Sequence, residues 1–414
     1  MTGRPPDRRV RWLIASALLL RLALFGLAAR DPARFQVEED SAEYTRLGLN
    51  LAAGHGFSQS TAPPYRPDIR RTPVYPALVA LAVLIPCGGL YLAVLAGLGA
   101  SVVTVVALHR LGRWFHGPSA AWWASWLLAV DLTSAAYSTQ ILTESLFALL
   151  LTISVLLLLD SRLSDRTAAV SAGLLAGVAA LCRPIAIFVS AALLPACRWR
   201  APRQTTRAAL LWAAVVAVSG LPVGLWTARN YRAADVGTFT SLAATNMYLH
   251  RAAYVEASLE GRRVEEVRDA WVREFDGRAS AWTPRERIDW MNGHGRSLVL
   301  AHPLVYGRVA LKGIARMLKP DVIVLPQILQ ADTARTTWRA VMGIAYAQLA
   351  IVYTLASYSV LRKLRIVPWS VAVPVAVIGY FVVIGGPEMY PRFRVPLMPF
   401  FCLLAGAGLA GDES

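Results

Sequence analysis

Apolar runs recur along almost the whole sequence, and they most constrain how it can fold. Runs of about 15–20 residues with few charges span a hydrocarbon core of about 30 Å when they are helical. A bilayer core offers no water to backbone groups, so such spans must be helices. The sequence therefore predicts an all-α polytopic membrane protein with about ten transmembrane helices (9–12), at roughly 11–29, 90–108, 119–137, 141–159, 168–181, 183–199, 207–226, 338–361, 368–384 and 394–410.

The basic charge of the chain is spread between these runs. The 414 residues carry a formal net charge of +16, but the basic residues lie in short links and not on one compact domain. This pattern is typical of the positive-inside rule and of contacts with anionic headgroups. It favours membrane lipids as partners and argues against nucleic acid. The four cysteines show no metal-ligand spacing.

One apolar stretch, 73–86, decides the topology. Its roughly 14 residues, at about 1.5 Å each, are too few to cross the core, so we expect a re-entrant or interfacial helix. With the N-terminus inside, the basic links at 109–113, 162–166, 198–207 and 362–365 then all lie in the cytoplasm. The run 11–29 is an uncleaved signal anchor, because no clear cleavage site precedes Arg30. The sequence thus predicts a multi-pass protein of the plasma (inner) membrane with both termini inside.

The same topology divides the chain into three parts. Residues 1–226 form an N-terminal module with its first external loop at 30–89, residues 227–337 an external region, and residues 338–414 the C-terminal helices. In the external region, Thr283 and Glu286 frame a capping box, so a helix starts there and breaks near Gly293 to Gly295. Amphipathic segments at 264–275 and 305–318 flank this helix.

The first external loop opens with three consecutive carboxylates, of which Asp40 is the last. Glu43 follows Asp40 by three residues, a capping signature that predicts a helix from about Ser41 to Ala53. Tyr44 lies one turn after Asp40. Asp40 is therefore either a helix cap or a base that accepts a proton from a hydroxyl group.

Arginines and tyrosines are predicted on the same outer face as Asp40. Arg71 and Tyr75 close the first loop, and arginine suits a phosphate because its planar fork donates two hydrogen bonds. Anchoring to lipid headgroups is the alternative. Further positive charge at this face comes from Arg229, Arg392 and Arg394.

Glu144 and Arg183 lie at the edges of apolar helices. A charge in such a place is unfavourable unless it is paired or functional. The two residues are therefore either part of a site or a structural ion pair. The topology was chosen from the basic links alone, and it places Glu144 and Arg183 on the same outer face as Asp40. This shared side favours a common site.

Six segments, in this order, resemble the polyprenyl-phosphate-dependent GT-C glycosyltransferases. The likeness spans roughly residues 10 to 410 and is greatest to bacterial members related to protein O-mannosyltransferases and to the lipid A aminoarabinose transferase. The ordered set is specific for the superfamily but not for a substrate. The segments are EDSAEYTRLGLNLAAGHGFS, YRPDIRRTPVYPALVALA, LTESLFALLL, LCRPIA, LWTARNYRAADVGTF with NMYLH, and YPRFRVPLMPFFCLLAG.

The resemblance implies a GT-C-like bundle whose cavity opens to the outer face. A polyprenyl-phosphate sugar donor would bind there, and inverting transfer would go to a lipid, glycan or protein acceptor. The family's acidic position maps onto Asp40, with Glu39 as a rival, and its second carboxylate onto Glu144. An Asp-Ser pair replaces the Asp-Glu pair of the protein-mannosylating branch, which weakens the case for a protein acceptor. No cofactor is certain, and a divalent cation is a candidate because its use differs among members.

The sequence thus predicts a membrane glycosyltransferase that transfers a hexose or pentose. A transporter or lipid flippase is the alternative, but it would show internal repeats and polar residues near the midplane, and neither is clear. A non-catalytic membrane scaffold would not explain why the carboxylates and arginines gather on one face. The catalytic candidates are Asp40, Glu39 and Glu144, and the substrate-binding candidates are Tyr44, Arg71, Tyr75, Arg183, Arg229, Arg392 and Arg394.

Overall fold

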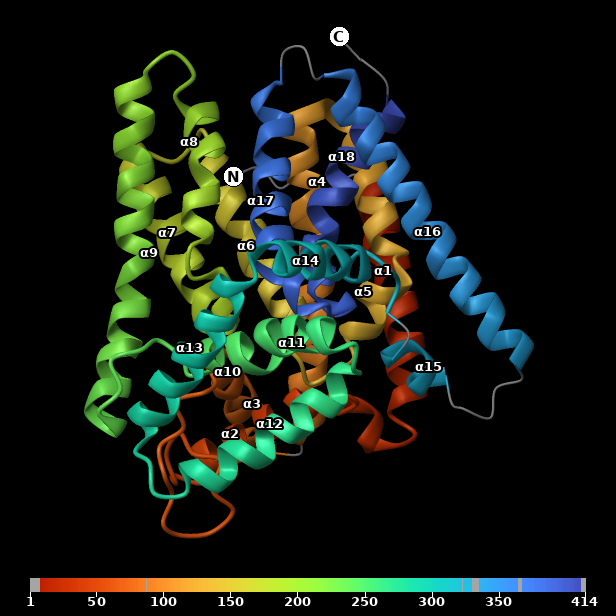
Figure 1. Ribbon diagram of the computed structural model, residues 1–414. Helices are drawn as coiled ribbons and strands as arrows, with labels where there is room; N and C mark the ends of the chain where they lie inside the picture. The colour runs from red at the N-terminus through yellow and green to blue at the C-terminus, as the bar shows by residue number, and fades with distance from the viewer. Residues whose placement is uncertain (1–7, 87, 322, 330–334, 364–366, 411–414) are drawn as a thin grey trace.

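The computed structural model describes residues 8–86, 88–321, 323–329, 335–363 and 367–410, and the regular structure in these ranges is entirely helical (Figure 1). The predicted all-α polytopic fold is confirmed. Within these described ranges, seven helices are long and apolar enough to cross a membrane, or eight if one bent pair counts as a single span. The predicted number of ten spans stays a prediction, and the basic link at 362–365 lies in part outside the described ranges.

The long apolar helices begin and end within a few residues of most predicted spans. Hydrophobic length and the lack of charge are local properties, so the sequence places these helices well. They are α1 (Arg8–Ala28), α4 (Gly89–Ala129), α7 (Asp165–Cys182), α9 (Thr205–Ala234), α16 (Arg335–Arg362), α17 (Trp369–Gly385) and α18 (Met398–Ala410). Helix α6 (Glu144–Leu159) is a shorter apolar helix at the predicted span 141–159.

Helix α4 contains two limbs that replace the predicted spans 90–108 and 119–137. Gly117 has φ 84°, which ends the first limb, and Pro118 opens the second. A Cβ atom on Gly112 would lie 2.8 Å from the Cα atom of Ala121, so the chain doubles back at this point. The second limb ends at Ala129 and is followed by the short helix α5 (Leu132–Tyr137).

The predicted span 183–199 is not one continuous helix, so this prediction was wrong. It consists of two 3₁₀ segments, η2 (Pro184–Ala186) and η3 (Val189–Leu193), followed by α8 (Leu194–Arg200). Pro184 and Pro195 each lack the N–H group that an α-helix needs for its i→i−4 bond. The apolar run therefore folds in pieces.

Small residues allow the bundle helices to approach closely. Helix α7 packs on α9, and a Cβ atom on Gly177 would lie 2.6 Å from the carbonyl oxygen of Ser219. On the other side of the bundle, α18 packs on α4, where Gly406 faces Ala120 and Ala124. Such contacts stabilise membrane bundles because lipid gives little hydrophobic drive for helix association.

We expect Gly177→Ala to lower the thermal unfolding temperature of the detergent-solubilised protein. The added methyl group has no space, and overpacking of this kind destabilises by about 1–3 kcal/mol. Gly224→Ala is the matched control, because no atom lies within 4 Å of its Cβ position and alanine favours a helix by about 0.5–1 kcal/mol. An unfolding temperature of Gly177→Ala at or above that of the wild type would contradict the close packing of α7 on α9.

The first external loop forms a short helical layer at the end of the bundle that is lower in Figure 1, opposite the α8–α9 connection. It contains η1 (Pro32–Phe35), α2 (Glu39–Ala52) and α3 (Val74–Leu84). Helices α2 and α3 pack together, α3 packs on α4, and η1 contacts α1. The 11 residues of α3 extend about 16 Å, roughly half of a hydrocarbon core. This length agrees with a helix that does not cross.

The region after α9 adds a second layer of short helices. The capping box at Thr283 and Glu286 is present, and the predicted amphipathic segments lie in α12 and α14. The predicted break near Gly293 to Gly295 was wrong, because α13 continues to Ala301 and then meets α14 at a bend of 101°. The elements are α10 (Leu242–Thr245), the π-helix η4 (Asn246–Ala252), α11 (Ala253–Glu260), α12 (Val264–Ala279), α13 (Pro284–Ala301), α14 (Pro303–Met317) and α15 (Val324–Leu329).

Candidate active site

The start of α2 places two carboxylates beside an arginine. Glu38 is the N-cap residue of α2, its side chain makes no capping bond, and Asp40 lies within the first turn. The predicted Asp40–Glu43 cap was therefore wrong. Instead, Asp40 and Glu43 both accept hydrogen bonds from Arg71. The Nε of Arg71 donates to Glu43 at 2.5 Å, and one of its terminal nitrogens donates to Asp40. Charge-assisted bonds of this kind are about twice as strong as neutral ones, so they win over a local cap.

A second arginine reaches Asp40 from the far end of the sequence. Arg392, in the 3₁₀ segment η6 (Pro391–Leu397), donates to the other oxygen of Asp40 at 2.5 Å and lies 3.4 Å from Glu38. Its Nε is buried and has no hydrogen-bond partner among the described residues. We call Glu38, Asp40, Glu43, Arg71 and Arg392 the carboxylate–arginine cluster.

The cluster keeps Asp40 ionised. Burial by itself would raise the pKa of the Asp40 carboxyl, but Arg392 and Arg71 outweigh it and hold this pKa well below its usual range. Glu38 behaves in the opposite way, because burial raises its pKa and Arg392 offsets this only in part. Two neighbouring carboxylates thus differ in proton affinity, which is a common feature of active sites.

Two buried tyrosines, Tyr44 and Tyr75, pack next to the cluster. The Arg71 guanidinium lies over the ring of Tyr44, 5.2 Å from its centroid, and Tyr44 meets the edge of Tyr75 at 5.2 Å. Burial raises the pKa of Tyr44 to about 12. Its hydroxyl group therefore keeps its proton at neutral pH and can act as a hydrogen-bond donor.

Glu144 and Arg183 form an ion pair close to this cluster. Arg183 donates to one Glu144 oxygen at 2.5 Å, and Glu144 is almost fully buried at the start of α6. The ion pair that the sequence gave as one alternative is therefore present, and a role of Glu144 and Arg183 in the site stays a prediction. The second Glu144 oxygen has no partner among the described residues, and Arg183 also lies 4.9 Å from the ring centroid of Phe393, next to Arg392.

Besides Arg183, two of the predicted arginines lie outside the cluster. Arg229 donates to the carbonyl oxygen of Asp68 at 2.5 Å and stacks on Trp226, so it ties the first loop to α9. Arg394 is fully buried and donates to Thr133. Glu39 is exposed and makes no hydrogen bond or ion pair in the described part of the chain, whereas Glu38 contacts Arg392.

Sequence reasoning missed His250 and Glu388 as individual candidates. Arg268 donates to Nδ1 of His250 at 2.9 Å, and since a guanidinium only donates, Nε2 of His250 carries the proton. Burial and Arg268 lower the pKa of His250 to about 4, so the ring is neutral. Glu388 is buried 3.6 Å from Arg251. Their only signal was position: His250 closes the segment NMYLH, and Glu388 lies two residues before the segment YPRFRVPLMPFFCLLAG.

A divalent cation does not fit the site as it stands. No group of three or more His, Cys, Asp or Glu residues in the described part of the chain could hold a metal ion. Both oxygens of Asp40 already accept from guanidinium groups. We therefore derive no step through a metal.

Comparison with known proteins gives the fold. No protein-family model matches the chain, and no curated protein matches it. The oligosaccharyltransferase of Archaeoglobus fulgidus in its apo form superimposes with a TM-score of 0.53 at 14% identity, over 95% of this chain and 50% of that chain. The chain shares the fold of the aligned part of this enzyme. The same enzyme in complex with Zn and sulfate gives a TM-score of 0.54 at 13% identity, over 95% and 48%.

The GT-C resemblance is thus confirmed at the level of the fold. The chain spans about half the length of the oligosaccharyltransferase. ArnT from Cupriavidus metallidurans in the apo state is also similar, with 15% identity over 92% of this chain and 77% of that chain, but its TM-score is only 0.38.

Proposed function

We propose that this protein is a glycosyltransferase that moves a sugar from a polyprenyl-phosphate donor to a cell-envelope lipid, glycan or protein acceptor at the extracytoplasmic face. The observation that carries the proposal is Asp40 held between Arg71 and Arg392 at one end of a membrane bundle. The GT-C fold supports it, and one structure of the similar oligosaccharyltransferase is a complex with an inhibitory peptide and a dolichol-phosphate. Arginine pairs of this kind suit the phosphate of such a donor.

In the proposed reaction, the donor phosphate displaces Asp40 from the arginines. Arg392 has an unpartnered buried Nε that a phosphate oxygen can accept from, and Arg71 adds a second fork. Asp40 is a weak base while both cations hold it, because a low pKa disfavours proton uptake. The arriving phosphate neutralises these cations, which raises the proton affinity of Asp40 when the donor is bound.

In the transfer step, Asp40 acts as the base. The acceptor oxygen attacks the anomeric carbon, the bond from this carbon to the phosphate oxygen breaks, and polyprenyl phosphate leaves. The acceptor proton passes to Asp40, and direct displacement inverts the anomeric centre. Tyr44 positions Arg71 through its ring, whereas Arg229 and Arg394 act by fixing the loop and the bundle.

The function is tested by mass spectrometry of lipid-linked sugars and envelope glycans from cells with and without the gene. Loss of one glycan together with accumulation of one lipid-linked sugar would support the proposal and name both substrates, including hexose or pentose. Unchanged glycans would contradict it. Lipid scrambling by purified protein in liposomes, without any donor, would favour the flippase alternative.

The pH dependence of transfer reports the charge of Asp40. Because the arginines hold its pKa low, the free enzyme should lose no activity through Asp40 protonation between about pH 8 and pH 5. Arg71→Gln removes one cation, so this pKa rises and the acid limb of kcat/KM moves to higher pH. Arg70→Gln is the matched control, since Arg70 contacts Glu43 at 3.5 Å and not Asp40. An unshifted limb in Arg71→Gln would contradict this assignment.

A further inference from the structure

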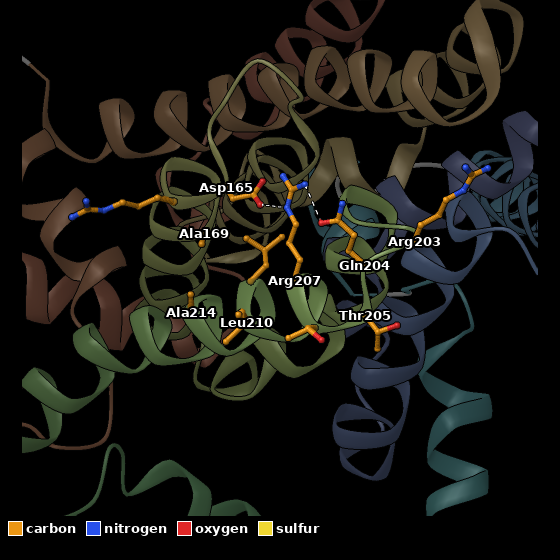
Figure 2. Close-up of a pocket in the computed structure, with 11 residues that line it drawn as sticks. Asp165, Ala169, Arg203, Gln204, Thr205, Arg207, Leu210 and Ala214 are labelled. Carbon is orange, nitrogen blue, oxygen red and sulfur yellow. Dashed lines mark hydrogen bonds and ion pairs between the residues drawn. The ribbon is translucent and has the colours of Figure 1, made fainter.

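A groove lies at the end of the molecule opposite the carboxylate–arginine cluster, between the first turns of α7 and α9 (Figures 1 and 2). Its volume is about 860 Å³. The topology predicted from the basic links places this end at the cytoplasmic membrane surface. The proposed sugar transfer makes no use of it.

The centre of the groove holds one neutralised carboxylate. Asp165 accepts from Arg200 at 2.8 Å and from Arg207 at 2.6 Å. Figure 2 shows Arg207 between Asp165 and Gln204. With two arginines on one aspartate, Asp165 has no capacity left to balance other charges.

The remaining cations of the groove have no such partner. Arg166 and Arg203 are exposed lining residues, and no carboxylate of the described residues lies within ion-pair distance of them. In Figure 2, Arg203 extends away from Asp165. Three lining arginines face one lining aspartate, so the groove carries an excess of positive charge. It therefore complements an anion.

The wall of the groove is apolar and continues along the bundle. Leu210 is 67% exposed and lines the groove together with Ala169 and Ala214. Leu174 on α7 and Leu221 on α9 are 41% and 60% exposed further along the same two helices. A small soluble anion gains nothing from such a wall, but an acyl chain does. The combination of excess cations and an apolar wall points to a lipid.

We propose that this groove binds one anionic glycerophospholipid of the cytoplasmic leaflet. Its headgroup phosphate lies near Arg166 and Arg203, and one acyl chain lies on Leu210. The site is independent of the sugar-transfer proposal, because it shares no residue with the cluster.

Native mass spectrometry of the full chain with phosphatidylglycerol or phosphatidylcholine tests the site. We expect one retained phosphatidylglycerol molecule and little retained phosphatidylcholine. Arg166→Gln with Arg203→Gln should weaken this binding roughly 25-fold, at about fivefold for each arginine near an anionic headgroup. Arg110→Gln with Arg113→Gln is the matched control, since it removes two exposed arginines from another basic link.

Leu210→Asn and inorganic phosphate separate a lipid from a soluble anion. Leu210→Asn should weaken phosphatidylglycerol binding, and millimolar inorganic phosphate should not displace the lipid. Equal loss in both double variants would show nonspecific surface charge and overturn the proposal. Displacement by phosphate, or full binding by Leu210→Asn, would also overturn it. Unchanged unfolding temperatures show that each variant is folded.

Discussion

Asp40→Asn is expected to lower sugar transfer by about 10²–10⁴-fold, which is the range for loss of a general base. Asparagine keeps the shape of the side chain but cannot take the acceptor proton. The variant should insert into the membrane normally, because Asp40 lies in the loop helix α2 and not in a long apolar helix. The rate is measured with purified protein and its polyprenyl-phosphate sugar.

Glu39→Gln is the matched control for this experiment. It changes the adjacent carboxylate of α2, which is exposed. Its rate should remain near that of the wild type. If Asp40→Asn turned over at the wild-type rate, Asp40 would not be the base, and strong loss in Glu39→Gln would transfer this role to Glu39.

Arg392→Gln should have the second largest effect, on both stability and donor affinity. The change leaves Asp40 and Glu38 near each other with one cation fewer, and removing one partner of a buried ion pair destabilises by about 3–5 kcal/mol. The donor phosphate also loses its contact with the planar guanidinium group of Arg392, so KM for the donor should rise. Thermal unfolding and steady-state kinetics measure the two effects.

Two further variants separate the effects of Arg392→Gln. Arg392→Lys keeps the charge without the planar fork, so it should restore much of the stability but only part of the donor affinity. Asp40→Asn combined with Arg392→Gln should be more stable than Arg392→Gln alone and still inactive. A donor KM unchanged in Arg392→Gln would rule out a phosphate contact at this residue.

The sequence by itself determined the membrane fold and most of its helices. The length of an apolar run and the absence of charges act within each segment, so spans such as 11–29 and 368–384 are close to α1 and α17. It also named Asp40, Arg71 and Arg392 as candidates, because the predicted topology places them on one face of the bundle and arginine suits a phosphate.

Only the tertiary structure decided which charges meet. Arg392 is 352 residues from Asp40, and no local pattern reports a contact over such a distance. Glu43 reads as a capping residue in sequence but bonds to Arg71, 28 residues away, because a cation is the stronger partner. The phase of α2 leaves Glu39 exposed, so Glu38 contacts Arg392 instead. Local hydrophobicity thus fixes the helices, whereas packing of distant loops assembles the site.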